Sequence, residues 1–116
     1  MKVLICGDRE WEDYWAIYDV ISRLDRSSII IHGAARGADT IAGTIAKKLG
    51  FKEVVAVPAE WKVYGKAAGP IRNKKMLELE PDLVIAFHNN IENSKGTKNM
   101  KEIAEKKGVE VQVYGS

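Results

Sequence analysis

The sequence has only one cysteine and no long apolar run, so it lacks the residues that would cross-link the chain or anchor it in a membrane. Its 116 residues include one cysteine, Cys6, so neither an intrachain disulfide nor a multi-cysteine zinc site can form. No apolar run approaches the roughly 18 residues of a membrane-spanning helix, and the stretch before Gly7 is too short for a signal peptide. We therefore expect a cytoplasmic protein with no membrane partner.

An excess of one charge is also missing. The formal net charge is +2, from 18 basic and 16 acidic residues that are interspersed along the chain. Proteins dedicated to nucleic acid usually carry a basic stripe or face. The charge pattern therefore disfavours nucleic acid as the partner.

The sequence contains no cluster with the spacing of metal ligands. Its two histidines, His32 and His88, are not joined by cysteines or carboxylates at such a spacing. We expect no resident metal. A magnesium ion that accompanies the phosphate of a ligand, with Asp8 or Asp39 near it, is the one cofactor that the sequence leaves open.

The sequence does contain apolar, strand-like runs that alternate with helical patterns. Runs that are apolar at consecutive positions are typical of strands buried on both faces, as in parallel sheets. Their alternation with helices predicts βαβ units. We predict one α/β domain over residues 1–116, a Rossmann-like, doubly wound and mostly parallel sheet of about five strands flanked by helices. The predicted strands are 3–6, 29–32, 54–57, 83–87 and 109–113, with helices around 15–24, 41–49, 76–79 and 100–104.

In such a sheet the ligand binds outside the carboxyl ends of the strands, so the loops after the strands are the candidate site. The second strand is followed by residues 33–39, a loop of small side chains that opens onto a helix. Bare N–H groups and the helix dipole favour an anion there. The alternative is a set of tight turns that let the helix pack closely on the sheet. The candidate residues of these first two loops are Gly7, Asp8, Arg9, Gly33, Ala34, Arg36, Gly37 and Asp39.

The connection after the third strand combines aromatic, basic and small residues. It begins with Pro58, Glu60 and Trp61, and Lys66 follows. We predict that residues 64–71 form a non-helical lid, because glycines recur there. Trp61 can stack on a base and Lys66 can contact a phosphate. A lid packed by its own aromatic residues is the alternative.

Two later segments complete the candidate site. We predict that Arg72 and Asn73 begin a helix, where a cation opposes the helix dipole and therefore indicates an anionic partner. His88 ends the fourth strand and is either a hydrogen-bonding ligand residue or an ordinary surface residue. Gly96 and Thr97 open the last helix, where Thr97 either caps the helix or binds phosphate.

Together these segments resemble the YspA/YAcAr-like family of the SLOG superfamily, on residues 7–9, 33–39, 58–61, 65–73 and 96–97. This Rossmann-like group also holds the Smf/DprA DNA-uptake proteins and the LOG-type phosphoribohydrolases. The resemblance implies a nucleotide or nucleotide-derived ligand and a homodimer or larger homo-oligomer. Exposed aromatic residues at the start of the first helix are the predicted contact between copies, namely Trp11, Tyr14 and Trp15.

The chain departs from the LOG-type signature, Pro-Gly-Gly-x-Gly-Thr-x-x-Glu, whose glutamate is catalytic. Only Gly96 and Thr97 match it, and Met100 occupies the glutamate position. A thioether can neither activate water nor stabilise an oxocarbenium-like centre. The predicted function is therefore binding, by a sensor or sequestering module. The alternatives are an N-glycosidase or transferase that uses Asp39 and Glu60 instead, and a protein associated with single-stranded nucleic acid.

Overall fold

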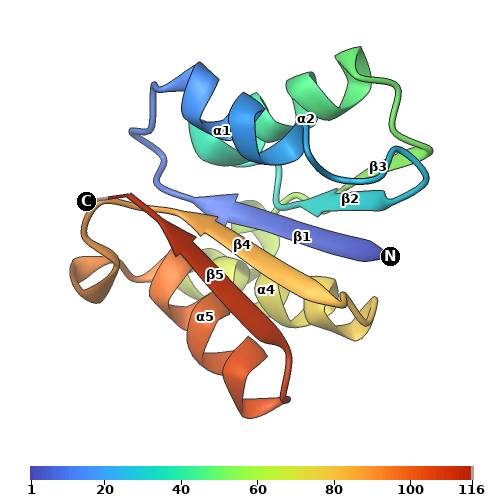
Figure 1. The fold of residues 1–116 in the computed structure, drawn as a ribbon. Coiled ribbons are helices and arrows are strands. Elements are labelled where there is room, and N and C mark those ends of the chain that lie inside the picture. The colour runs from blue at the N-terminus through green and yellow to red at the C-terminus, as the bar shows by residue number, and fades with distance from the viewer. Residues whose placement is uncertain (116) are drawn as a thin grey trace.

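The predicted apolar runs form the strands of the computed structural model, which describes residues 1–115 (Figure 1). The strands are β1 (Lys2–Gly7), β2 (Ile29–His32), β3 (Glu53–Ala56), β4 (Leu83–Phe87) and β5 (Glu110–Tyr114). All of them pair in parallel, in the order β3-β2-β1-β4-β5. This is the Rossmann-like sheet that the sequence predicts. The strand order reverses between β1 and β4, so the switch point of the sheet lies between these two strands.

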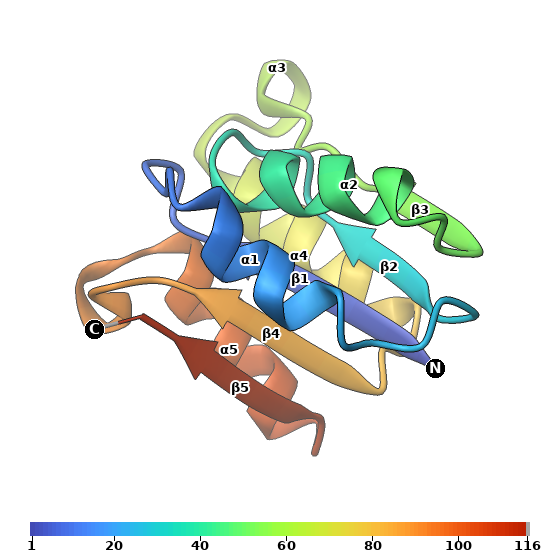
Figure 2. The same ribbon diagram turned by 45° about the horizontal axis from the view of Figure 1, so that its top comes forward.

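Helices cover both faces of the sheet (Figure 2). On one face lie α1 (Tyr14–Ile21) and α2 (Ala38–Lys48), and on the other lie α4 (Ala68–Glu78) and α5 (Gly96–Lys106). The single turn α3 (Trp61–Tyr64) has no buried residue and projects from these layers in Figure 2. The chain at α3 is therefore held by fewer apolar contacts than the rest of the fold.

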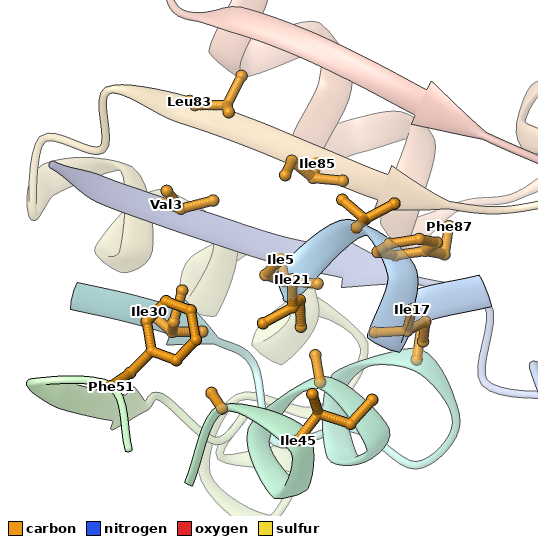
Figure 3. Packing of buried hydrophobic residues seen from close by; sticks show 14 residues of the cluster. Val3, Ile5, Ile17, Ile21, Ile30, Ile45, Phe51, Leu83, Ile85 and Phe87 are labelled. Atoms are coloured by element: carbon orange, nitrogen blue, oxygen red, sulfur yellow. The ribbon is translucent and has the colours of Figure 1, made fainter. Parts of the chain in front are cut away.

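The core consists of two apolar layers, one on each side of the sheet. Successive side chains of a strand point to opposite faces, so Val3 and Ile5 of β1 pack under α1 and α2, whereas Leu4 and Cys6 pack against α4 and α5. Figure 3 shows the first layer, in which β4 contributes alternate residues in the same way. Burial on both faces explains why β1 and β4 are apolar at consecutive positions.

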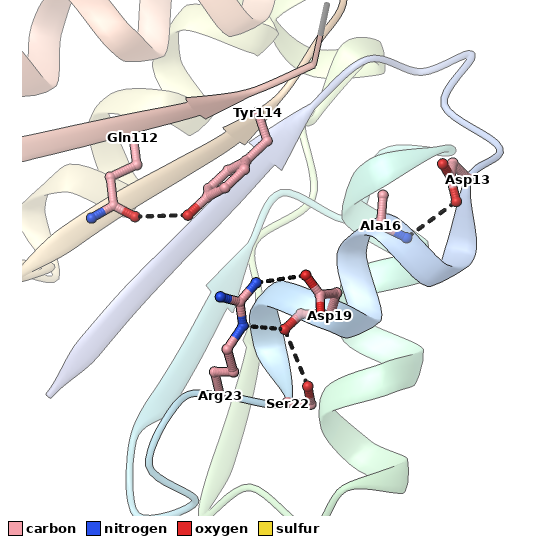
Figure 4. A network of polar contacts seen from close by, with 7 residues as sticks. All are labelled: Asp13, Ala16, Asp19, Ser22, Arg23, Gln112 and Tyr114. Atoms are coloured by element: carbon pink, nitrogen blue, oxygen red, sulfur yellow. Dashed lines mark hydrogen bonds and ion pairs between the residues drawn. The ribbon is translucent and has the colours of Figure 1, made fainter.

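Short polar contacts fix the two ends of α1 (Figure 4). The Asp13 carboxylate accepts a hydrogen bond of 3.1 Å from the N–H of Ala16, which satisfies one of the free donors of the first turn. Arg23, just after the helix, pairs with Asp19 at 2.6 Å. Both of these side chains are exposed, so the pair contributes little to stability.

Glycine ends two helices, as the sequence predicts. Gly50 follows α2 with φ 76°, and Gly108 follows α5 with φ 82°. An L-residue with a side chain rarely adopts this backbone conformation, which closes the last turn of a helix. The fifth strand, β5, begins one residue later than predicted.

The predicted lid after β3 is wrong in its second half. Helix α4 begins at Ala68, although Gly69 and Pro70 follow directly. Proline is tolerated in the first turn of a helix because its missing N–H would have no partner there. Arg72 and Asn73 consequently lie in the second turn of α4 and do not begin it. The position of Arg72 relative to the helix dipole therefore does not indicate an anionic partner.

The aromatic residues near α1 differ in their exposure. Trp15 is 69% exposed, whereas Trp11 and Tyr14 are half-buried. The Trp11 ring packs edge-on against Phe87, with 5.7 Å between the centroids. Trp15 is therefore the one aromatic of this group that is free for a contact, and the homo-oligomer stays a prediction. Within residues 1–115 no helix is long and apolar enough to cross a bilayer.

Candidate functional site

Two neighbouring cavities open at the carboxyl ends of the strands. The larger, of about 690 Å³, lies over the switch point between β1 and β4, and the smaller, of about 370 Å³, lies beside the loop after β2. Arg9, Trp61 and Arg72 line both. The predicted site residues that the structure brings to the cavities are Gly7, Asp8, Arg9, Gly33, Ala34, Arg36, Asp39, Pro58, Trp61, Lys66, Arg72, Asn73, His88, Gly96 and Thr97.

Arg72 is a buried cation in the wall between the two cavities. Its side chain donates from Nη1 to the carbonyl oxygen of Gly33 at 2.6 Å and from Nε to Oδ1 of Asn73 at 2.9 Å. Asn73 in turn donates to the carbonyl oxygen of Gly96 and to Asn99. Hydrogen bonds through Arg72 thus tie the loop after β2 to α4 and to the start of α5.

The charge of Arg72 is not matched by a contacting carboxylate. Within residues 1–115, no acidic oxygen lies within 4.0 Å of its guanidinium and Nη2 has no hydrogen-bond partner. The residue is only 9% exposed. Burial lowers the pKa of Arg72 from its ordinary value, and attraction by Asp39 partly offsets this effect. A buried cation with free donors at a cavity wall is suited to an anionic ligand.

Asp39, at the start of α2, serves the fold. Its Oδ2 accepts a hydrogen bond of 2.8 Å from the N–H of Gly33, and the residue is 4% exposed. Burial raises the pKa of Asp39 to about 6, although the Gly33 N–H and the charge of Arg72 pull it the other way. A carboxyl held in this way is a poor candidate for acid–base work on a ligand, because the fold already uses its accepting oxygen.

Several N–H groups of the glycine-rich loop after β2 donate to other parts of the protein. Besides Gly33, Ala34 donates to Nδ1 of His32 at 3.0 Å, and Ala38 donates to the carbonyl oxygen of Asp8 at 3.1 Å. A Cβ on Gly37, whose φ is 78°, would lie 2.4 Å from that same Asp8 oxygen. The geometry therefore favours the packing alternative for this loop, and Gly37 lines neither cavity.

The start of α5, in contrast, has free donors. Within residues 1–115, no acceptor is found for the N–H groups of Gly96 and Thr97, whereas that of Lys98 donates to Oγ of Ser94 at 2.9 Å. Thr97 is 7% exposed, lines the larger cavity, and its hydroxyl has no hydrogen-bond partner among the same residues. A hydroxyl that faces the cavity next to two free N–H groups at a helix start is a suitable phosphate site.

Trp61 and Arg9 meet above the wall between the two cavities. The guanidinium carbon of Arg9 lies 5.4 Å from the centroid of the Trp61 ring, a cation–π contact. Trp61 is 48% exposed, and its edge rests on Gly69, where a Cβ would be 3.4 Å away. Lys66, also exposed, lines the larger cavity. One large aromatic face is therefore available at the cavity mouth for a base.

Asp8 and His88 lie on either side of the switch point, at the ends of β1 and β4. Their facing atoms, Oδ2 of Asp8 and Nε2 of His88, are 3.9 Å apart. The other carboxylate oxygen of Asp8 accepts from the N–H of Glu10 at 2.9 Å, and Nδ1 of His88 accepts from the N–H of Asn90 at 2.9 Å. Both side chains are therefore held in fixed orientations at the cavity.

Neither the candidate catalytic residue Glu60 nor Met100, which occupies the position of the LOG-type catalytic glutamate, reaches the cavities. Glu60 is exposed and lines neither of them. Met100 is fully buried against Met76 and other apolar residues on the α4 and α5 side of the sheet, and it also lies outside both cavities. Asp39 already accepts a hydrogen bond from the Gly33 N–H, and Glu60 lies outside the cavities, so neither supplies a free carboxylate to a ligand.

Sequence reasoning missed several residues that line the larger cavity. Ser94 and Lys95 directly precede the predicted helix start at Gly96, and this position alone gave the signal for them. Cys6 also reaches the cavity wall, but burial raises its pKa above the ordinary value, so it remains a thiol. Within residues 1–115 no group of three histidine, cysteine or acidic residues can hold a metal ion.

Comparison with known proteins agrees with this geometry. Residues 1–64 match the model of the YspA, cpYpsA-related SLOG family. The chain belongs to this family. Gene 61 protein of Mycobacterium phage D29 is 35% identical to this SLOG protein over 122 residues, which cover 98% of the chain and 96% of the phage protein.

A solved structure shows the same fold. DNA processing protein A (DprA) of Streptococcus pneumoniae superposes with a TM-score of 0.81 at 24% identity over 99% of this chain. The SLOG protein spans half the length of that chain. The family and the Rossmann-like fold that the sequence motifs indicate are thus confirmed.

Proposed function

We propose that this SLOG protein binds a nucleotide or nucleotide-derived phosphate ligand in the cavities at the carboxyl ends of its strands. The observation that carries the proposal is the largely buried Arg72, whose Nη2 reaches the cavity with no hydrogen-bond partner and whose guanidinium has no contacting carboxylate within residues 1–115. Removing such a charge from water is costly unless an anion or a set of acceptors satisfies it. A ligand phosphate supplies both.

The surroundings of Arg72 support a phosphate in particular. The free N–H groups and the hydroxyl at Gly96 and Thr97 line the same cavity, as do the ammonium groups of Lys66 and Lys95. No ion pair engages either lysine within residues 1–115. Donors from a helix start combined with several cations are the features with which proteins hold phosphate groups.

Trp61 supports a nucleotide over a bare phosphate. Its half-exposed ring stands at the mouth shared by the two cavities, where a base can stack on it. Arg9, now over the ring, is a cation that the ligand phosphate can attract. The two cavities together therefore offer a place for a phosphate and a place for a base.

The same arrangement favours holding the ligand over cleaving it. The glutamate of the LOG-type signature is replaced by Met100, which lies in the core, and Glu60 lies outside the cavities. We infer that the protein acts as a sensor or as a sequestering protein. For the alternative from sequence, hydrolysis by Asp39 or Glu60, Glu60 lies outside both cavities, and Asp39 lines the larger one but already accepts a hydrogen bond from the Gly33 N–H.

A second candidate function, binding of single-stranded nucleic acid, rests on the surface around α3. Trp61 and Tyr64 are exposed by 48% and 43%, and Lys62 and Lys66 lie beside them on the chain. Exposed aromatic rings between cations suit successive bases of a single strand. The structural neighbour DprA is a DNA processing protein. A steep fall of oligonucleotide affinity with salt would favour this function.

A thermal-shift screen tests the proposal. Nucleoside mono-, di- and triphosphates, cyclic nucleotides and ADP-ribose derivatives are each added to the protein, and every compound that raises Tm is incubated and examined by mass spectrometry. A stabilising ligand recovered intact supports a binding protein. Release of free base or ribose phosphate would show an enzyme, and no shift with any compound would contradict the proposal.

A further inference from the structure

The space between Asp8 and His88 has the dimensions of a binding site for one oxygen atom. Their facing atoms, Oδ2 and Nε2, are 3.9 Å apart, which is too long for a direct hydrogen bond. An oxygen that sits about 2 Å to the side of the line joining these two atoms lies about 2.8 Å from both, an ordinary hydrogen-bond distance. The two side chains are 29% and 12% exposed, and both line the larger cavity.

The hydrogen bond made by one ring nitrogen of His88 determines whether the other ring nitrogen donates or accepts toward Asp8. Nδ1 accepts a hydrogen bond from the N–H of Asn90 at 2.9 Å, so in the neutral ring the proton is on Nε2. This is the nitrogen that faces Asp8. His88 therefore offers a donor to anything placed between the two side chains.

Asp8, in contrast, offers a hydrogen-bond acceptor to the same space. Its Oδ1 is occupied by the N–H of Glu10 at 2.9 Å, which turns Oδ2 toward His88. A carboxylate oxygen only accepts hydrogen bonds. A group between Asp8 and His88 must therefore donate to one side and accept from the other. A hydroxyl group does both, whereas a phosphate oxygen is repelled by the carboxylate and a methylene does neither.

The position along the cavity identifies the part of the ligand. Thr97, which has free donors, belongs to the segment that follows β4. Trp61 belongs to the segment that follows β3 and also lines the smaller cavity, beside the loop after β2. Asp8 ends β1, which lies between β2 and β4 in the sheet. If the phosphate is at Thr97 and the base is at Trp61, the middle of the cavity holds the sugar, since the sugar joins phosphate and base in every nucleotide.

We propose that Asp8 and His88 bind a ribose hydroxyl of the ligand, so that this protein selects ribonucleotides over deoxyribonucleotides. The inference rests on the proposed function, because it assigns the part of the same cavity that phosphate and base leave free. A ligand that lacks the hydroxyl leaves the Asp8 carboxylate and the His88 N–H without partners in a covered site. Sites built around a hydroxyl reject analogues without it for this reason.

Isothermal titration of the wild-type protein with matched pairs tests the inference. The probes are the four ribonucleoside 5′-monophosphates and their 2′-deoxy and 3′-deoxy counterparts. We expect the ribonucleotide of the recognised base to bind about tenfold or more tightly than at least one deoxy counterpart. Ribo and deoxy forms that bind within about twofold of each other would overturn the inference and leave the proposed function standing. Failure of these probes and of every compound in the thermal-shift screen to bind would overturn both.

Two variants assign the preference to these side chains. Asp8→Ala and His88→Phe should each bring the affinities of the ribo and deoxy forms to within about threefold, because each removes one hydrogen-bond partner. Asp19→Asn is the matched control, since it alters a carboxylate that pairs with Arg23 on the surface of α1 and lines neither cavity. It should keep the preference. Melting temperatures show that each variant is folded. A preference that survives in both folded variants would contradict the assignment.

Discussion

Nη1 of Arg72 lies 2.6 Å from the carbonyl oxygen of Gly33, so the cation that faces the cavities is also part of the fold. From sequence, Arg72 is a ligand residue at the start of a helix. The structure adds a second role, in which its guanidinium fixes the loop after β2. Replacement by alanine would remove both roles at once. Substitutions of Thr97 and Trp61 distinguish a loss of ligand affinity from a loss of stability better than a substitution of Arg72 does.

The variant Thr97→Val removes the hydroxyl while keeping the shape of the side chain. Because the hydroxyl has no hydrogen-bond partner within residues 1–115, we expect the free energy of unfolding to change by less than about 0.5 kcal/mol. Affinity for a nucleoside monophosphate should fall about ten- to hundredfold, the contribution of one hydrogen bond to a charged group. Denaturant unfolding and calorimetric titration measure the two effects.

Thr44→Val provides the matched control for that experiment. Thr44 is an exposed threonine of α2 that lines neither cavity. Its replacement should leave affinity unchanged. An unchanged affinity in Thr97→Val as well would place the phosphate somewhere other than the start of α5.

The variant Trp61→Ala tests the base-stacking position. The ring is 48% exposed and belongs to a helical turn without buried residues, so Tm should change little. Loss of a stacked base costs about 1–3 kcal/mol of binding free energy, and the affinity for nucleotides should fall accordingly. Trp15→Ala, which alters another exposed tryptophan, should leave affinity intact. Equal affinities of the two variants would remove Trp61 from the site.

Gly37 and Gly50 form a natural pair for a stability experiment. Both have positive φ, 78° and 76°, but a Cβ at Gly37 would lie 2.4 Å from the Arg9 carbonyl oxygen, whereas nothing lies within 4 Å of one at Gly50. Gly50→Ala should cost about 1–2 kcal/mol of stability, from backbone strain alone. Gly37→Ala should cost at least about 2 kcal/mol more. Urea unfolding with equal m-values checks this, and equal losses would refute close packing at Gly37.

Asp39 makes stability depend on pH. Burial raises its pKa in the folded protein from the ordinary 3.8 to about 6, so the native state holds the proton more tightly than the unfolded chain does. Its contribution to stability is therefore greatest below about pH 4 and declines until about pH 6. Relative to Asp39→Asn, the wild type should lose roughly 3 kcal/mol or less over this range. The measurement is the free energy of unfolding of both proteins between pH 4 and 7.

An exposed carboxylate provides the control for the pH experiment. Asp19 pairs with Arg23 on the surface of α1, and the difference between wild type and Asp19→Asn should vary by less than about 1 kcal/mol over the same pH range. If the Asp39→Asn difference is as flat as this one, the carboxyl of Asp39 titrates normally and its burial has no electrostatic consequence.

Sequence reasoning predicted the sheet well because strands buried on both faces have an unmistakable composition. The runs around Ile5 and Ile85 are apolar throughout, the run around Ile31 is apolar up to His32, and all three form strands. It also predicted that the loops at the strand ends converge, since the carboxyl ends of parallel strands share one edge. For this reason most of the predicted site residues do line the cavities.

The failures have physical causes that composition does not reveal. Gly69 and Pro70 suggested a break, but both are compatible with the first turn of α4, and tertiary packing of Met76 and Leu77 outweighed their low propensity. The loop containing Gly37 looked free to bind phosphate, because which N–H groups the fold itself uses depends on contacts between distant segments. That the unpartnered hydroxyl of Thr97 faces the cavity is likewise visible only in three dimensions.

The most direct test of the central claim is a calorimetric titration of the wild-type protein with nucleoside 5′-monophosphates and with the same nucleosides lacking phosphate. Because Arg72, Lys66 and the start of α5 are assigned to the phosphate, the account predicts that one phosphorylated form binds at least about tenfold more tightly than its nucleoside. Equal affinities within such a pair, or no binding of any phosphorylated form, would contradict it.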